Sequence, residues 1–304
     1  MSSKNSKVLK VNSKPSQVCS GEMINYTDEH VAIIRKWLEE EPNLPGDFEE
    51  AMIKRFLHCC SNDIERTKKV MKLFFNCRLN FKEFFGNADF HSDQVQRILT
   101  AIDTLPLPRR TKEGYQVYVT RLRDTNPDNF NLADYSKMFF MMHDTRMRTE
   151  DIPAGDVPIL DMEGFSFKHL TKLIFNFGTL KKYLLYNQEA HPVKLMQVHI
   201  VNTNGLLHKA FSLVKPLLNP HVKDMLHFHT PGSDTIDEFV PKDLLPKEYG
   251  GNTGSVDELK EIWVKKIKEQ AEWLAIEDRW KEIPPEKLNK QIDLEQSFSK
   301  IEFD

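Results

Sequence analysis

His227 and His229 are the side chains whose spacing comes nearest to a metal site. They stand two residues apart in a stretch with strand character, 226–229, so both point to one face of a sheet. A metal site would need a third ligand and, for catalysis, an open position. The alternative is that both imidazoles make local hydrogen bonds at the end of the sheet. We expect this alternative, and therefore no metal or other cofactor.

Other reactive side chains do not form a catalytic set. The carboxylates of Asp144, Asp161 and Glu163 have no spacing that would pair two of them in a cleft. The sequence has no glycine-rich phosphate-binding motif and no nucleophile elbow, G-x-S-x-G. Its cysteines lack metal-ligand spacing, and most lie in a helical pattern where reduced, buried thiols are ordinary; they are Cys19, Cys59, Cys60 and Cys77. We therefore expect no enzyme activity.

The first part of the chain has the apolar spacing of helices. Between Thr27 and Phe85, hydrophobic residues recur every three or four positions, and Asp63 or Asn62 is placed to cap a helix. Residues 1–26 are rich in serine and lysine and predict a mobile arm without a secretory signal. We expect an all-helical domain at residues 27–100.

Residues 101–275 alternate between strand and helix patterns, which predicts an α/β sheet covered by helices. A connector with Pro106 and Pro108 opens this region, and residues 276–304 form an acidic tail. The predicted strands are 116–121, 157–160, 195–201 and 226–229, and the predicted helices are 135–143, 167–186 and 205–218.

Composition excludes several classes of partner. The formal net charge is −3, with 42 Lys and Arg against 45 Asp and Glu, so no global basic field would hold nucleic acid. The longest stretch without a charged side chain, counting histidine as neutral, runs only from Leu195 to His208, which is too short to span a bilayer. We expect a soluble, cytoplasmic monomer.

The charge is unevenly distributed. Residues 165–231 contain eight lysines, no arginine and two acids, together with seven of the eleven histidines. Within them, the predicted helix 205–218 is apolar on more than one face. Such a region is either a solvated basic face above a packed core, or a membrane-contacting surface above an apolar cavity. The pattern alone favours the packed core over the cavity.

Three short sequence strings favour the cavity over the packed core. The string 244–252 (LLPKEYGGN), with 161–164 (DMEG) and 199–202 (HIVN), resembles the lipid-binding domain of the CRAL-TRIO (Sec14-like) family. Residues 51–78 resemble the small helical domain that precedes it in that family. The two glycines of the first string permit a turn with positive φ. The resemblance covers residues 28–275 and is greatest to the carriers of tocopherol and retinaldehyde.

The resemblance implies an N-terminal helical domain and an α/β/α sandwich, whose mainly parallel sheet encloses a hydrophobic cavity gated by a mobile helix. The gate would be residues 202–225, with Leu206 and Leu213 facing the membrane. The implied cavity-lining residues are Met142, Leu160, Phe165, Phe175, Tyr183, Tyr186, Val198, Ala210, Val214 and Leu218.

The tocopherol carriers hold a phosphoinositide head group with four basic side chains, which correspond here to Lys194, Met196, His221 and Met225. One lysine in place of four cations removes most of the charge-assisted pairing. Lys194, Lys215 and Lys223 would then give only general attraction to anionic lipid. Tyr183 and Tyr186 replace aliphatic residues of those carriers, and their hydroxyls predict a more polar end of the cavity.

The sequence therefore predicts a non-enzymatic carrier of one small hydrophobic ligand, with transient membrane contact. The ligand class is an isoprenoid: a retinoid, tocopherol, carotenoid or related terpenoid. The alternative is an interaction protein of the Sec14 type that senses or exchanges a phospholipid.

Overall fold

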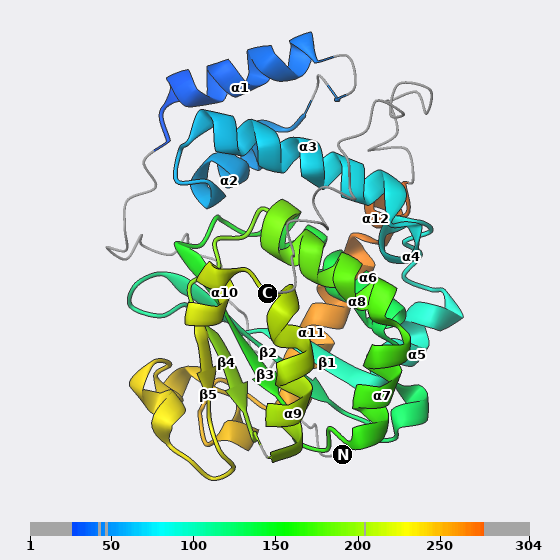
Figure 1. Cartoon of the computed structure of the whole chain (residues 1–304). Coiled ribbons are helices and arrows are strands. Elements are labelled where there is room, and N and C mark those ends of the chain that lie inside the picture. Colours follow the sequence, from blue (N-terminus) through cyan, green and yellow to red (C-terminus); the bar gives the residue numbers. More distant parts are fainter. Residues whose placement is uncertain (1–25, 42–43, 46–47, 204, 277–304) are drawn as a thin grey trace, which may run out of the picture.

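The computed structural model describes residues 26–41, 44–45, 48–203 and 205–276. A layer of helices lies above a five-stranded sheet that is itself covered by helices (Figure 1). This arrangement confirms the predicted α/β class with a helical N-terminal region. The predicted arm and acidic tail lie outside the described residues, apart from their innermost residue.

The N-terminal helices follow the predicted apolar pattern. Asp63 caps the third of them: its side chain accepts a hydrogen bond from the backbone N–H of Arg66 at 3.0 Å, as expected for a short polar residue at this position. The helices of this region are α1 (Asp28–Glu40), α2 (Glu50–Cys59), α3 (Ile64–Asn80), α4 (Lys82–Phe85) and α5 (Asp93–Ala101).

The sheet has the order β1-β2-β3-β4-β5, antiparallel between β1 and β2 and parallel elsewhere. Its strands are β1 (Ile102–Pro106), β2 (Tyr115–Leu122), β3 (Gly155–Asp161), β4 (Val198–Val201) and β5 (Leu226–Phe228). Between the strands lie α6 (Leu132–Thr149), α7 (Phe167–Phe175), α8 (Phe177–Leu185), α9 (Gly205–Val214) and α10 (Pro220–Asp224), and α11 (Val256–Glu269) and α12 (Ala271–Ala275) follow β5.

Strand β1 was not predicted, because its residues read as part of a proline-containing connector. Asp103 and Thr104 are buried in the middle of it and interrupt the apolar alternation. The carboxylate of Asp103 is compensated by Arg123 at 2.8 Å and by Lys260 at 3.0 Å. Pro106 is tolerated because it ends an edge strand.

Two of the predicted covering helices are broken. Residues 167–186 form α7 and α8 with a break at Asn176, and a π-helical turn, Tyr186–Ala190, follows. Residues 205–218 form α9 and then a 3₁₀ turn, Lys215–Leu217. Pro216 accounts for the second break, since it has no N–H to continue an α-helix.

The two faces of the sheet belong to two cores. Val117 and Val119 of β2 pack with Val240 and Leu245 from the segment after β5, whereas Tyr118 between them faces the helices α6 and α8. This is the alternation expected of a strand buried on both faces. The core on the Tyr118 side continues without interruption into α1, α2 and α3.

A buried ion pair lies in this continuous core. Arg78 of α3 donates two hydrogen bonds to Asp144 of α6, at 2.8 Å and 2.5 Å, and a third to the hydroxyl of Tyr186 at 3.0 Å. The two charged side chains are 1% and 6% exposed. The guanidinium also lies over the rings of Phe74 and Phe85. The pair fixes the helical layer to the helix that covers the sheet.

Removing one partner of this pair should be severely destabilising. We expect Arg78→Met to lower the free energy of unfolding by about 3–5 kcal/mol, because Asp144 is left as a buried, uncompensated charge. Urea denaturation measures the change. The double variant Arg78→Met, Asp144→Leu should recover most of it.

Lys36→Met provides the control, since Lys36 is exposed and lies 3.8 Å from Glu40 on α1. It should change stability by less than about 0.5 kcal/mol. Equal effects of Arg78→Met and Lys36→Met would contradict the assignment.

Candidate ligand-binding site

The predicted lining residues from the sheet lie on one face. Leu160 of β3 is paired with Ile200 of β4, which is paired in turn with Phe228 of β5, and Val198 is two residues from Ile200. These side chains therefore point to the same face, on the side of α6, α8 and α9. Phe211 of α9 contacts Phe228, with ring centroids 4.9 Å apart. Ile200 and Phe228 were not predicted, although strand alternation could have found them.

Two further predicted residues belong to the aromatic core on this face. Met142 of α6 is fully buried. Tyr183 of α8 is half-buried, and its ring lies about 6 Å from those of Phe139, Phe140 and Tyr135. Burial raises the pKa of Tyr183 well above its ordinary value. Its hydroxyl is therefore neutral and can both donate and accept a hydrogen bond.

Tyr186 occupies a different environment from Tyr183. Its ring is fully buried against α3, and its hydroxyl oxygen accepts the hydrogen bond from Arg78. This hydroxyl was predicted to lie at the polar end of a ligand cavity, and in the structure it has a partner within the protein. The sequence held no signal for this contact, because Arg78 is 108 residues away.

The two predicted phenylalanines of the loop and helix after β3 also differ. Phe165 is half-buried and stacks on His169 at a centroid distance of 5.3 Å. Phe175, at the end of α7, is 83% exposed. In this conformation its ring faces solvent and does not line an enclosed space.

The helix expected to act as a gate lies over the β4–β5 side of the sheet (Figure 1). Val214 packs against the core, and Leu218 is half-buried. The side chains of Ala210, Leu206 and Leu213 are outside the described part of the chain.

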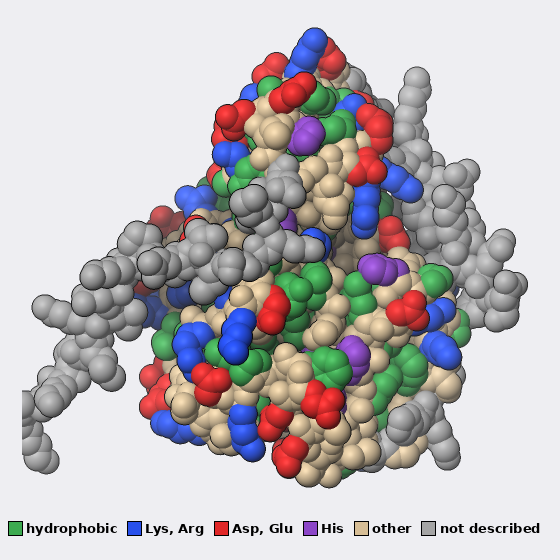
Figure 2. Space-filling model, turned by 90° about the vertical axis from the view of Figure 1, so that its left-hand side faces the viewer, with side chains coloured by type: hydrophobic (Ala, Val, Ile, Leu, Met, Phe, Trp, Pro, Cys, Tyr) green, Lys and Arg blue, Asp and Glu red, His purple; other side chains and the backbone are tan. Residues whose placement is uncertain are grey.

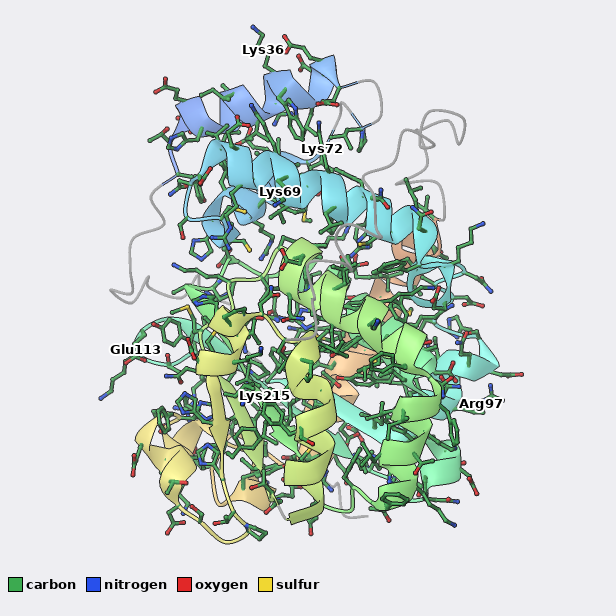
Figure 3. All side chains as sticks on the ribbon, viewed as in Figure 1. Lys36, Lys69, Lys72, Arg97, Glu113 and Lys215 are labelled. Atoms are coloured by element: carbon green, nitrogen blue, oxygen red, sulfur yellow. The ribbon has the colours of Figure 1, made fainter. Side chains whose placement is uncertain are left out.

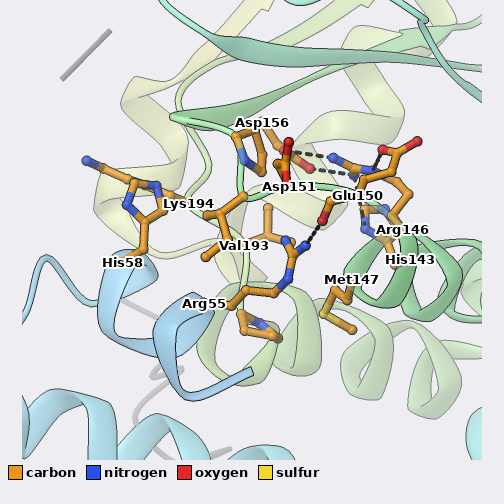
Figure 4. A pocket seen from close by; sticks show the side chains of 13 residues that line it. Arg55, His58, His143, Arg146, Met147, Glu150, Asp151, Asp156, Val193 and Lys194 are labelled. Atoms are coloured by element: carbon orange, nitrogen blue, oxygen red, sulfur yellow. Dashed lines mark hydrogen bonds and ion pairs between the residues drawn. The ribbon is translucent and has the colours of Figure 1, made fainter. Parts of the chain in front are cut away.

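Two of the three predicted anionic-lipid contacts lie in this region. Lys215 is exposed where α9 ends (Figure 3), and Lys223 of α10 is half-buried. Figure 2 shows the side of the molecule that carries β5 and α10, where side chains of both charges mix with hydrophobic ones. Lys194 lies elsewhere, at a polar pocket between α2 and α6 (Figure 4).

This polar pocket was not predicted. Arg146 makes two hydrogen bonds to Asp156, at 2.7 Å and 3.1 Å, and Arg55 donates to the carbonyl oxygen of Glu150. Burial, followed by repulsion from Arg146, lowers the pKa of Arg55 to about 10. The pocket encloses about 20 Å³, room for a water molecule and not for a lipid chain. The polar contacts around this pocket connect the helical layer to the sheet region.

The three strings that suggested the family meet at the end of β3. The carboxylate of Asp161 accepts hydrogen bonds from the side chain of Asn202 at 2.7 Å, from the hydroxyl of Tyr249 at 2.6 Å and from the backbone N–H of Glu163 at 2.9 Å. Asn202 has a φ of 56°, so the chain leaves β4 in a left-handed conformation just before α9. Asp161 thus positions the start of the expected gate.

The two glycines of the string 244–252 have separate roles. Gly250 has a φ of 77°, which is the expected positive-φ turn. Gly251 is required for another reason: a Cβ at this position would lie 2.0 Å from the carbonyl oxygen of Leu245. The close approach keeps Tyr249 within reach of Asp161.

In the part of the chain that the structure describes, His227 and His229 do not form a metal site with a third ligand. They cluster with His199 of β4 and with Phe239, and His229 bonds to Thr235 at 2.7 Å. Among the described residues, no group of three His, Cys, Asp or Glu side chains is arranged to hold a metal ion. Of the cysteines within the described ranges, Cys59, Cys60 and Cys77 are unpaired thiols.

Comparison with known families identifies the fold and its helical partner. The family model of the CRAL/TRIO domain matches residues 103–251, and that of the Pinta-like UBA domain matches residues 24–95. The chain carries a CRAL-TRIO domain. Within the described ranges, none of its helices combines the length and the apolar character needed to cross a membrane.

The alignments with curated relatives cover most of this chain but a smaller share of each relative. The chain is 24% identical over 222 residues to an alpha-tocopherol transfer protein-like protein of Homo sapiens, covering 72% of this chain and 63% of that protein. It is 22% identical over 213 residues to clavesin-1 of Xenopus laevis, with coverages of 69% and 63%. The chain therefore spans less than two thirds of either relative.

A solved structure supports the same fold. The crystal structure of Sfh5 matches with a TM-score of 0.50 at 12% identity, covering 80% of this chain and 96% of that chain. At this identity the likeness concerns the arrangement of helices and strands.

The left-handed residue at the start of the expected gate can be tested by two substitutions. Asn202→Gly loses the hydrogen bond to Asp161, whereas Asn202→Ala loses that bond and also strains the backbone. We expect the alanine variant to be less stable than the glycine variant by about 1–2 kcal/mol in urea denaturation.

At Lys69, which is exposed in the middle of α3, the order should reverse, because glycine is the poorer helix former by about 1 kcal/mol. An Asn202→Ala variant as stable as Asn202→Gly would refute the proposed strain.

Proposed function

We propose that this protein is a non-enzymatic, cytoplasmic carrier that binds one small hydrophobic molecule and releases it at a membrane surface. The observation that carries the proposal is the CRAL-TRIO domain, a lipid-binding domain, together with the apolar sheet face beneath α9. We propose Leu160, Val198, Tyr183, Val214 and Leu218 as ligand contacts on this face. Met142, Phe165 and Ala210 complete the proposed set.

We further propose that the ligand is an isoprenoid. An apolar chain gains about 25 cal/mol per Å² of surface removed from water, so burial alone can supply affinity. Tyr183 would bind the single polar group of such a ligand, since its neutral hydroxyl can serve a carbonyl or a hydroxyl. The Arg78 contact removes Tyr186 from this role.

A phospholipid-sensing or phospholipid-exchanging function is the second candidate. It is supported by the same lipid-binding domain, because an apolar sheet face can bury an acyl chain as well as an isoprenoid. The absence of cations at Met196 and Met225 counts against a multiply charged head group.

Membrane contact has a structural basis outside α9. Helix α7 exposes Phe167 by 65%, Ile174 by 45% and Phe175 by 83%, and neither α7 nor α8 contains an acidic residue. Exposed apolar side chains beside lysines are typical of surfaces that enter the head-group region of anionic membranes. We propose that Phe175 contacts the membrane rather than the ligand.

Native mass spectrometry of the freshly purified protein tests the ligand class. We expect an added mass equal to that of a single neutral isoprenoid. Release of such a ligand into water would expose its apolar surface, which is costly. A co-purified phospholipid would support the second candidate instead. Protein that remains empty after incubation with retinol, tocopherol and phospholipid vesicles would contradict both.

The membrane contact can be tested with vesicles that contain phosphatidylserine. Phe175→Ser should weaken co-sedimentation about tenfold, the equivalent of losing part of the 1.5–3 kcal/mol that a buried phenylalanine contributes. Ile262→Ser is the matched control, because Ile262 is 50% exposed on α11. Equal binding of both variants would place the membrane contact elsewhere.

A further inference from the structure

Three histidines lie together on the face of β4 and β5 that is turned away from α9. His199 and His227 are paired across the two strands, with ring centroids 5.1 Å apart and planes at 21°. His229 follows β5, and its ring lies 5.2 Å from that of His199. Phe239 covers the group, with its ring 5.0 Å from His199 and 4.5 Å from His227. His199 is fully buried and His229 is 4% exposed.

The hydrogen bonds in this cluster run in one direction. Nε2 of His199 lies 3.2 Å from the amide oxygen of Gln197, which can only accept, so this nitrogen carries a hydrogen. Nδ1 of His199 then accepts, and Nε2 of His229 donates to it at 3.0 Å. Nδ1 of His229 is left as an acceptor for the hydroxyl of Thr235 at 2.7 Å. The imidazoles of His199 and His229 thus each carry one hydrogen and are neutral.

Additional protons are poorly accommodated. A proton on Nδ1 of His199 would face the N–H of His229, and charge on either ring would be buried beside the other imidazoles. Burial, followed by His229 and His227, lowers the pKa of His199 to about 3. Burial and His227 also lower the pKa of His229, with Glu238 opposing them.

The charged and titratable groups that face the cluster are few. On β5 the neighbour is His227, and on the segment after β5 it is Glu238, which is exposed. Just before β4, Gln197 is neutral. In the described residues, no carboxylate is hydrogen-bonded to His199 or His229 to compensate a charge on either ring.

The cluster is attached to both ends of the segment that contains α9 and α10. The backbone N–H and the hydroxyl of Thr203, just before this segment, donate to the carbonyl oxygen of His229 at 3.0 Å and 2.9 Å. The N–H of His229, just after the segment, donates to the carbonyl oxygen of Ile200 at 2.9 Å. Movement of His229 would therefore release both ends together.

We propose that His199 and His229, packed against His227, form a pH-sensitive clamp, which holds both ends of the α9–α10 segment at neutral pH and opens as His199 and His229 become protonated. The clamp itself stands on the geometry of the three rings. Its consequence, ligand release at an acidic membrane, rests on the proposed carrier function.

The direction of the pH dependence follows from the neutral state. His199 binds a proton more weakly when the clamp is closed than when it is open, where its pKa is near 6.5. The stabilisation is therefore complete above about pH 6.5 and is lost as the pH falls toward the closed-state pKa. Between pH 7.5 and 5.0, one such histidine favours the open state by about 30-fold.

Amide hydrogen exchange of the full chain tests the clamp without any ligand. The N–H groups of Thr203 and His229 report on the two attachments. After correction for intrinsic exchange rates, we expect their protection to fall by about 30-fold or more from pH 7.5 to 5.0. The double variant His199→Asn, His229→Gln should show less than about a threefold fall, since both amides are uncharged at either pH.

His91→Gln is the control. It makes the same chemical change at a histidine that is exposed in the helical region. It should keep the full pH dependence. Protection at Thr203 and His229 that does not change with pH in the unsubstituted protein would overturn the proposal. Nitrogen chemical shifts of the imidazoles give a second test if the double variant does not fold. Closed-state pKa values near 6.5 for His199 and His229 would also overturn it.

Transfer of all-trans-retinol to vesicles, followed by its fluorescence, tests the consequence. Transfer should be several-fold faster at pH 5.0 than at pH 7.5 in the unsubstituted protein and independent of pH in the double variant. Retinol that does not bind at pH 7.5 would count against a retinoid carrier, while the exchange result would still decide the clamp. Bound retinol with pH-independent transfer would overturn the release mechanism alone.

Discussion

The buried pair of Arg78 and Asp144 is the constraint on which the rest of this structure depends. Two opposite charges are stable in an apolar core only when they compensate one another. Here Arg78 comes from α3 and Asp144 from α6. The pair therefore fixes how the helical layer lies on the helix that covers the sheet. Tyr186 joins it, and so the pair also fixes the turn after α8. The proposed ligand-binding face is bounded by these same elements.

A second carboxylate organises the opposite end of the domain. Asp161 ends β3, receives Tyr249 from the segment after the sheet, and holds Asn202 at the exit from β4. On the other face of β4, the histidines connect that exit to β5. The α9–α10 segment is thus attached to the sheet from both faces of one strand. Its internal packing, by contrast, depends on apolar contacts such as that between Phe211 and Phe228.

The sequence predicted local features well and long-range partners poorly. The cap at Asp63 and the shared face of alternate residues in strands depend on neighbours in the chain, so they are visible in the pattern. Strand β1 was missed because Asp103 is buried there, and its compensation by Lys260 comes from a distant helix. The contact between Tyr186 and Arg78 was not predicted, because the two residues are far apart in the chain. The family strings predicted the fold, but they contained no information about which atoms would meet at Asp161.

The helical layer and the sheet region share one continuous core. No linker separates the helical layer from the sheet, since α5 ends at Ala101 and β1 begins at Ile102. Aromatic side chains of both parts interlock around Phe140 and Tyr186. The helical layer therefore does not pack as an independent module, and a substitution on one side of this contact changes the packing of the other.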